Sequence, residues 1–225
     1  MFVGELLCGE VPALSPADGW LDIVAIARRP GVLSKVAIRP RRDVLPPLMV
    51  GIGADHLARV SQQLDGERLE VVQWQRSASA YIAGALGLAE VPPVWLLPGL
   101  GHARVLLGEI DIRGIAGWRG LNAILASSLT GWRIRLEPVT ATAAWSRLQA
   151  AMLARRHVTG SVVGRTVRGP RLDTLGLYAV LTNGEASPEL EVGQEVEVRI
   201  TRMNPDEGRI FVTDRLTTRR QLPLL

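Results

Sequence analysis

The sequence predicts an α+β protein in which two successive α+β units are followed by a small five-stranded β-barrel. Two observations lead to this prediction. Within residues 1–139, strand-like alternation, glycine turns and helical periodicity recur twice in the same order. From residue 157 onwards, helical periodicity gives way to short alternating runs separated by glycine-containing turns, which is typical of a small barrel. A chain of 225 residues is long enough for two or three small domains, each with its own core.

The first unit is expected to contain two strands, a helix, a third strand and a second helix. Alternating apolar residues favour the strands, and a glycine turn at 51–54 opens the first helix, with Asp55 as its cap. The sequence Asp65-Gly66 stops that helix. The predicted elements are strands 21–26 and 35–38, a helix over 55–64, strand 68–72 and helix 77–86.

The second unit repeats this plan and leads into the barrel. Its predicted elements are strands 94–97 and 104–107, a short helix 111–116, a helix between the glycines at 117–120 and Gly131, and strand 132–136. An alanine-rich linker helix over 140–156 carries Trp145, Leu148 and Met152 on one side. The barrel, residues 157–216, has strands at 160–164, 177–181, 193–200 and 209–212, and the tail 217–225 has no pattern.

The composition excludes several classes of protein. The longest apolar runs, such as 94–97, are too short to span a bilayer, and the first residues lack the features of a secretory signal, so we expect a cytoplasmic location. Cys8 is the single cysteine, which excludes an internal disulfide and a cysteine zinc site. The histidines are far apart in the sequence, and the single lysine, Lys35, is not part of a P-loop. We expect no catalysis, no metal and no cofactor.

Basic residues gather in two tracts that contain no acidic residue, although the formal net charge is only +4. The first tract spans 23–42 and the second spans 138–172. A run of charge is usually a solvated face, but two basic tracts on either side of a glycine loop favour nucleic-acid binding.

That glycine loop is Gly117-Trp118-Arg119-Gly120, followed by a short helix with apolar periodicity. Two glycines let the backbone approach a sugar-phosphate chain, and the following helix points its free N–H groups and its positive dipole end at the same place. KH domains hold about four nucleotides of single-stranded RNA with such a loop. Asn122 and the segment 129–132, which lie at a fixed offset from the loop, make the pattern specific.

Further segments resemble the tandem KH module of the NusA family of bacterial transcription factors. The resemblance extends from residue 2 to about 136, and it is carried by segments 10–12, 25–31, 34–38, 66–72, 81–86 and 89–91. Residues 158–214 resemble an S-one type RNA-binding OB domain, chiefly in 190–198 and 208–210. The resemblance implies two tandem type II KH domains, residues 1–89 and 90–139, followed by a five-stranded OB-fold barrel.

The sequence departs from the family pattern in three respects. NusA places its OB domain before the KH pair, whereas here it follows the pair. We expect no counterpart of the N-terminal domain through which NusA engages RNA polymerase, so the resemblance does not imply polymerase binding. The first loop lacks the final glycine of the family and is followed by Asp55, whose carboxylate would repel a phosphate. A structural role and a weak RNA-binding role for Gly51 and Gly53 are therefore equally open.

Three residues of the second loop are candidate RNA contacts, each with an alternative. Arg119 can offer a charged donor fork to a phosphate, or it can be an ordinary solvated arginine. Trp118 can stack on a base or pack against a neighbouring domain. Asn122 can read a base edge or satisfy the unpaired backbone N–H donors at the start of the helix.

The remaining candidates lie outside this loop. Tyr178 occupies a position where the resembled OB domains present an aromatic ring to a base, and the alternative is an ordinary tyrosine on a β-surface. The histidine that accompanies it in that family is missing from 183–188. The basic side chains expected to contact RNA are Arg28, Arg29 and Lys35 and, more weakly, Arg155, Arg156 and Arg165.

We therefore expect a monomeric, non-catalytic protein that binds single-stranded RNA and acts in transcription elongation, termination or antitermination. RNA polymerase and the ribosome are candidate partners, and a membrane is not. One alternative is a ribosome-associated or RNA-processing adaptor. Another is a protein-interaction scaffold that has lost RNA binding, which the degenerate first loop favours.

Overall fold

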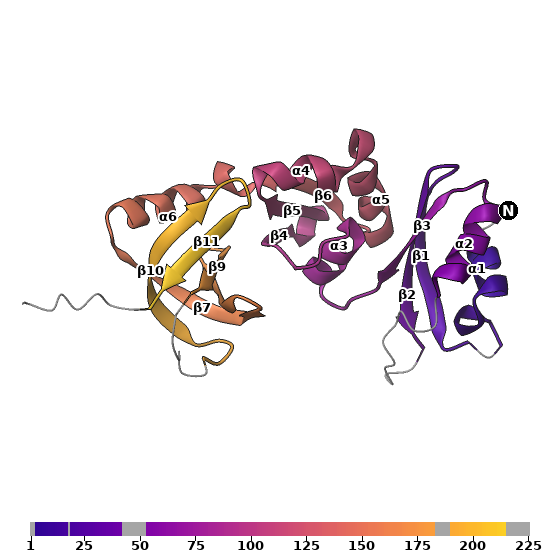
Figure 1. Ribbon diagram of the computed structural model, residues 1–225, viewed down its shortest axis with the longest axis horizontal. Helices are drawn as coiled ribbons and strands as arrows, with labels where there is room; N and C mark the ends of the chain where they lie inside the picture. The colour runs from indigo at the N-terminus through magenta and orange to yellow at the C-terminus, as the bar shows by residue number, and fades with distance from the viewer. Residues whose placement is uncertain (1–2, 18, 42–52, 183–189, 215–225) are drawn as a thin grey trace, which may run out of the picture. The chain divides into compact units, whose positions relative to one another are not determined.

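The computed structural model describes residues 3–17, 19–41, 53–182 and 190–214 (Figure 1). The chain divides into two compact units. The first unit takes residues from 1–105 and 114–136, and the second takes residues from 106–113 and 137–225. The domain boundaries predicted from the sequence remain predictions, since these units group the elements differently.

The N-terminal part of the first unit is a three-stranded sheet with two helices on one face (Figure 1). The strand order is β1-β2-β3, in which β2 runs antiparallel to β1 and parallel to β3. Helices α1 and α2 pack against each other, and α2 contacts β3. The elements are α1 (Val3–Glu10), β1 (Leu21–Arg29), β2 (Leu33–Pro40), α2 (Ala54–Gln63) and β3 (Arg68–Gln73).

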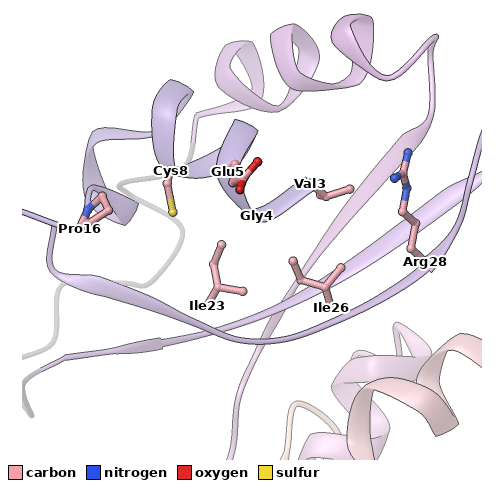
Figure 2. Close-up of a pocket in the computed structure, with 8 residues that line it drawn as sticks. All are labelled: Val3, Gly4, Glu5, Cys8, Pro16, Ile23, Ile26 and Arg28. Atoms are coloured by element: carbon pink, nitrogen blue, oxygen red, sulfur yellow. The ribbon is translucent and has the colours of Figure 1, made fainter. Parts of the chain in front are cut away.

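An open, largely apolar pocket of about 540 Å³ lies between α1 and the edge strand β1 (Figure 2). A β-bulge between Ile23 and Ala25 shifts the register of β1, so Ile23 and Ile26 both line the pocket. Gly4 of α1 faces these isoleucines, and a Cβ there would lie 3.3 Å from the Ile26 side chain. The other residues that line the pocket are Val3, Glu5, Cys8, Pro16 and Arg28.

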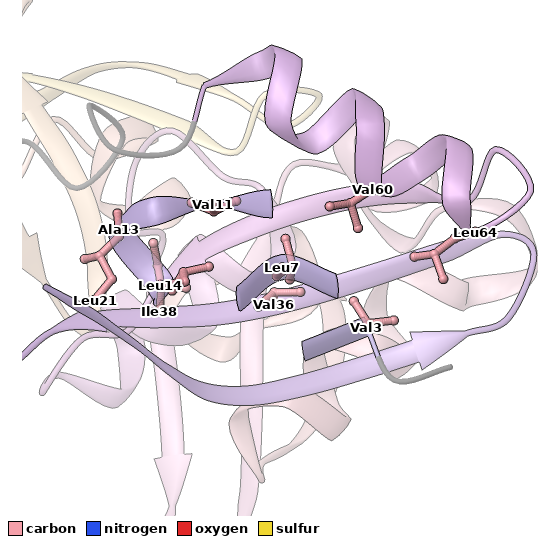
Figure 3. Close-up of a cluster of buried hydrophobic side chains, with 10 residues drawn as sticks. All are labelled: Val3, Leu7, Val11, Ala13, Leu14, Leu21, Val36, Ile38, Val60 and Leu64. Carbon is pink, nitrogen blue, oxygen red and sulfur yellow. The ribbon is translucent and has the colours of Figure 1, made fainter. Parts of the chain in front are cut away.

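The hydrophobic core of this part lies between the helices and the sheet (Figure 3). It is formed by Val3, Leu7, Val11, Ala13, Leu14, Leu21, Val36, Ile38, Val60 and Leu64. Strand β2 is buried at every position from Leu33 to Ile38. Because alternate residues of a strand point to opposite faces, both faces of β2 must be covered. Helix α5 (Leu121–Thr130) packs against β1 and β2 and contributes to this cover.

A second three-stranded sheet has the order β4-β5-β6. Helix α3 (Ala78–Leu86) precedes this sheet, and Ser77 caps its N-terminus by accepting a hydrogen bond from the Ala80 N–H. Gly131 ends α5 in the left-handed conformation. Helices α3 and α5 pack together, and the Tyr81 hydroxyl donates to the Leu129 carbonyl. The further elements are β4 (Val94–Leu97), β5 (His102–Leu107), α4 (Glu109–Ala116) and β6 (Arg133–Pro138).

The second unit contains a closed barrel with the strand order β10-β11-β9-β8-β7. Strands β7, β8 and β9 form an antiparallel meander, β9 pairs in parallel with β11, and β10 closes the barrel against β7. Helix α6 (Ala143–Leu153), capped by Thr142, packs against β10 and β7 and buries Trp145 and Leu148. The strands are β7 (His157–Thr166), β8 (Gly169–Thr174), β9 (Leu177–Leu181), β10 (Glu195–Asn204) and β11 (Arg209–Thr213).

The predicted α+β class and the closed five-stranded barrel are confirmed. The sequence did not predict α1 or β8, both of which are short, and the helix expected over 140–156 ends at Leu153. Asp55 does not cap α2, because the helix begins at Ala54 with Gly53 as the cap residue. Residues 217–225 lie outside the described part of the chain. Short 3₁₀ turns occur at Pro12–Leu14, Pro98–Leu100, Trp118–Gly120 and Val139–Ala141.

Candidate nucleic-acid interface

The glycine loop predicted from the sequence is a tight turn between α4 and α5. The Gly120 N–H donates to the Gly117 carbonyl over 3.0 Å, which closes the turn and leaves Trp118 and Arg119 at its two central positions. Gly117 has φ 74° and ψ −179°, Arg119 has φ 51° and ψ 29°, and Gly120 has φ 74° and ψ 12°. The backbone conformation of Gly117 is one that essentially only glycine adopts.

Gly117 is also needed for space. A Cβ built on Gly117 would lie 3.0 Å from the Asn122 Cβ and 3.3 Å from the Asn122 nitrogen, so the turn packs directly on the first turn of α5. A Cβ on Gly120 would meet no atom within 4 Å. The two glycines therefore have different roles. Gly117 permits the turn to approach Asn122 closely, and Gly120 permits a left-handed backbone at an open position.

The two central side chains of the turn face solvent. Trp118 is 70% exposed, Arg119 is exposed, and the Arg119 guanidinium lies over the Trp118 ring at 4.7 Å from its centroid. Such a contact is a favourable cation–π interaction, worth about 0.5–1 kcal/mol at an exposed site. A cation and an aromatic ring are thus presented together at the N-terminal end of α5.

Asn122 holds the elements around the turn together. Its Nδ2 donates to the Ile115 carbonyl of α4 at 2.7 Å and to the Leu86 carbonyl of α3 at 3.0 Å. An asparagine amide has two N–H donors, so both of them are engaged with backbone. This geometry favours a role for Asn122 in holding the helices together over direct reading of a base edge by its amide nitrogen. The backbone groups that Asn122 satisfies are carbonyls, not the N–H donors at the start of the helix.

The predicted contacts in the first basic tract have unequal access to RNA. Arg29 is exposed at the end of β1. Lys35 is 1% exposed and forms an ion pair with Glu70, which limits its access to RNA, and its role as an RNA contact stays a prediction. Its burial follows from the cover on both faces of β2, which is buried from Leu33 to Ile38.

Arg28 is held in a buried network centred on Glu67. Its guanidinium donates Nε and Nη2 to the Glu67 carboxylate at 2.9 Å each, and the side chain of Glu67 is fully buried. The Ser34 hydroxyl and the Gly31 N–H also donate to this carboxylate. Burial alone would raise the pKa of Glu67, but these donors outweigh it and lower the pKa. Glu67 was not singled out from the sequence, because no periodicity or spacing marks a buried carboxylate after a helix stop.

The first glycine loop is only partly described. Gly51 lies outside the described residues, and Gly53 is the exposed N-terminal cap residue of α2. Asp55 lies in the first turn of that helix. The question left open by the sequence, whether this loop is structural or binds RNA, stays open.

The candidate residues of the barrel lie on its outer surface. The ring of Tyr178 on β9 is half-buried, and the Arg171 guanidinium of β8 lies over it at 4.6 Å from the centroid. Arg165 is exposed on β7, and Arg155 and Arg156 are exposed after α6. The Arg171–Tyr178 pair was not predicted from the sequence, because β8, which carries Arg171, was not predicted.

Other kinds of site find little support in the described part of the chain. No group of three or more histidine, cysteine or acidic side chains there could hold a metal ion. Among the described residues, no helix is both long and apolar enough to cross a membrane. The pocket between α1 and β1 is largely apolar and contains only Arg28 of the candidate residues.

Comparison with known proteins agrees with the geometry. The family model of the NusA-like first KH domain matches residues 1–74. The N-terminal part of the chain is NusA-like. The chain is 34% identical over 135 residues to the transcription termination/antitermination protein NusA of Mycobacterium bovis, an alignment that covers 59% of this chain and 38% of the relative. It is 35% identical over 135 residues to NusA of Thermus thermophilus, with 59% and 34% covered, and 29% identical over 133 residues to NusA of Bacillus subtilis, with 58% and 35% covered.

The chain thus matches little more than a third of the length of these relatives. The resemblance to NusA inferred from the sequence is confirmed, and the first KH domain in particular. Which residues of this chain contact RNA remains a prediction.

Proposed function

We propose that this chain is a non-catalytic protein that binds single-stranded RNA and acts in transcription termination or antitermination. The exposed turn Gly117–Gly120 carries the proposal. It offers an arginine and a tryptophan to solvent at the N-terminal end of α5, where backbone N–H groups and the helix dipole favour a phosphate. The role in transcription follows the names of the NusA relatives.

A tandem arrangement of two type II KH domains is part of this proposal. The matched first domain has a helix followed by two antiparallel strands, a helix and a strand, in the sheet order β1-β2-β3. The segment from α3 to β6 has the same kind of order, with two helices before the closing strand and the sheet order β4-β5-β6. This repetition supports a second KH domain with the turn Gly117–Gly120 as its RNA clamp.

The barrel is proposed as an accessory RNA-binding domain. Its closed topology, with a meander, one parallel pair and a closing strand, fits an OB fold. Tyr178 and Arg171 lie on adjacent strands, β9 and β8, which correspond to the face through which OB folds bind single strands. RNA polymerase is proposed as a protein partner because the relatives act in transcription.

The proposal is tested by fluorescence anisotropy with a short labelled single-stranded RNA at several salt concentrations. The variant Trp118→Asp/Arg119→Asp places two carboxylates in the exposed turn. The native chain should bind RNA with an affinity that falls as salt rises, because phosphate contacts release counterions. The variant should bind at least about tenfold more weakly, since losing both the cation and the ring removes more than about 1.4 kcal/mol.

The matched control is Val167→Asp/Arg168→Asp at the exposed β7–β8 hairpin. It replaces an exposed apolar residue and an arginine by aspartates and makes the same change of net charge in the barrel. Because the barrel is proposed as an accessory RNA-binding domain, this variant should lose some affinity, but clearly less than the turn variant. Equal losses in both variants would contradict the turn as the main RNA clamp. No binding by the native chain at low salt would favour the scaffold alternative.

A further inference from the structure

The Trp118 ring has an open face that phosphate binding alone does not explain. It is 70% exposed although the Arg119 guanidinium already lies over it. A ring that is covered on one side and still mostly exposed must present its other face to solvent. Exposing a large apolar ring to water is unfavourable. The open face of Trp118 therefore favours a ligand contact.

The backbone of the turn fixes this arrangement. Trp118 and Arg119 occupy the central positions of the turn closed by Gly120 and Gly117. Arg119 adopts φ 51°, a conformation that side-chain-bearing residues rarely adopt. Asn122 ties the first turn of α5 to the carbonyls of Ile115 and Leu86, so the platform rests on three helices rather than on a loose loop.

We infer that Trp118 is a stacking platform for one unpaired base of the bound RNA, and that it prefers purines. This inference rests on the proposed function and adds a preference for one class of base to the turn proposed as the RNA clamp. The base occupies the open face of the indole, and Arg119 covers the opposite face and reaches toward the adjoining phosphate. A purine overlaps the indole over a larger area than a pyrimidine does, and stacking strength is the usual origin of modest base preference in single-strand binding.

A second tryptophan–arginine pair in the same unit offers a matched comparison. The Arg104 guanidinium lies 5.0 Å from the centroid of the Trp95 ring, between the paired strands β4 and β5. Trp95 is half-buried on a strand rather than presented at a turn. The pairing of a ring with a cation is thus common to both sites, and only the Trp118 site combines it with an exposed turn at a helix start.

The test measures anisotropy with labelled oligo-A, oligo-C and oligo-U of roughly eight nucleotides, about twice what one KH loop holds. The native chain is compared with Trp118→Leu, Trp118→Phe and the control Trp95→Leu, and circular dichroism verifies their folding. The native chain should bind oligo-A about fivefold more tightly than oligo-U. Trp118→Leu should weaken oligo-A binding about tenfold and abolish the preference, whereas Trp118→Phe and Trp95→Leu should keep it. Oligo-A should quench tryptophan fluorescence in Trp95→Leu but much less in Trp118→Leu.

Two results would overturn the platform while leaving RNA binding intact. One is equal affinity of the native chain for all three oligonucleotides, and the other is an adenine preference that survives Trp118→Leu. Failure of the native chain to bind any of them at low salt would overturn the proposed function together with the platform.

Discussion

The carboxylate of Glu67 anchors the turn between β1 and β2. It accepts hydrogen bonds from the Arg28 guanidinium, the Ser34 hydroxyl and the Gly31 N–H, and it has no exposed surface. A buried charge is tolerated only when such donors replace water. Arg28 therefore serves the first sheet, and its availability to RNA is limited by this pairing.

Glu67→Gln should destabilise the chain by about 2 kcal/mol, because a neutral amide cannot pair with Arg28 and brings an N–H group toward the donors at Ser34 and Gly31. Urea unfolding measures the difference. Glu10→Gln is the control: Glu10 pairs with the half-exposed Arg59, and its loss should cost less than about 1 kcal/mol. Equal effects of the two substitutions would contradict the role of the Glu67 network.

The lowered pKa of Glu67 also predicts a dependence of stability on pH. A carboxylate whose pKa is lower in the folded than in the unfolded chain stabilises the fold above the unfolded value of about 4.3. This contribution is lost as the pH falls through the folded pKa. The free energy of unfolding should therefore fall more steeply below about pH 5 in the native chain than in Glu67→Gln. Parallel curves for the two proteins would count against this assignment.

At the scale of secondary structure, the junction of α3, α4 and α5 determines where the turn Gly117–Gly120 lies. Asn122 links the last residue of α3 to the end of α4 from the first turn of α5. Gly117 lies close to Asn122, so the turn packs directly against this junction. The loop is thus positioned by hydrogen bonds to backbone, not by its own sequence alone.

Asn122→Ala should cost about 2 kcal/mol of stability, since two part-buried carbonyls lose their donor. The substitution should also weaken RNA binding, because the turn loses the hydrogen bonds that fix its position relative to α3 and α4. Asn122→Asp should be worse, since a carboxylate faces the same two carbonyl oxygens. The control is Asn204→Ala in the barrel, where Asn204 accepts from the N–H groups of an exposed turn. Unfolding and anisotropy measurements on these variants should separate them, and unchanged RNA affinity in Asn122→Asp would refute the positioning role.

At the scale of the whole molecule, residues 106–113 belong to the second unit, in which the backbone at Gly108 lies close to the β10–β11 turn. A Cβ on Gly108 would lie 2.3 Å from the Asp206 carbonyl oxygen in the β10–β11 turn, and the Ile110 N–H donates to that oxygen. The Thr140 hydroxyl also donates to Glu109 within this unit. The start of α4 is therefore packed against the barrel.

Gly108→Ala should lower the free energy of unfolding by about 1–3 kcal/mol, because the added methyl group cannot fit beside rigid backbone. Gly114→Ala, inside α4 and with nothing within 4 Å, should be neutral or stabilise by up to about 1 kcal/mol. Thermal unfolding of both variants measures the contrast. A Gly108→Ala chain as stable as the native one would mean that the contact is not maintained in solution.

Local pattern was enough to predict most elements of the fold and the residues of the glycine loop. Glycine and serine caps, alternating strands and the turn at 117–120 are local features, and the structure places the strands at 94–97 and 177–181 where they were predicted. The burial of Lys35 was not predicted, because β2 is covered by elements far along the chain, among them α5. The pairing of Arg171 with Tyr178 and the network of Glu67 likewise require contacts between strands that no single segment encodes.

The central claim, that the turn between α4 and α5 is the RNA clamp, is tested most directly by backbone amide chemical shifts. Single-stranded RNA is added to the ¹⁵N-labelled chain, and the shift of each amide is followed. The largest changes should occur at residues 117–124, where the turn and the first free N–H groups of α5 lie. Largest changes in the barrel strands, with residues 117–124 unmoved, would contradict the claim.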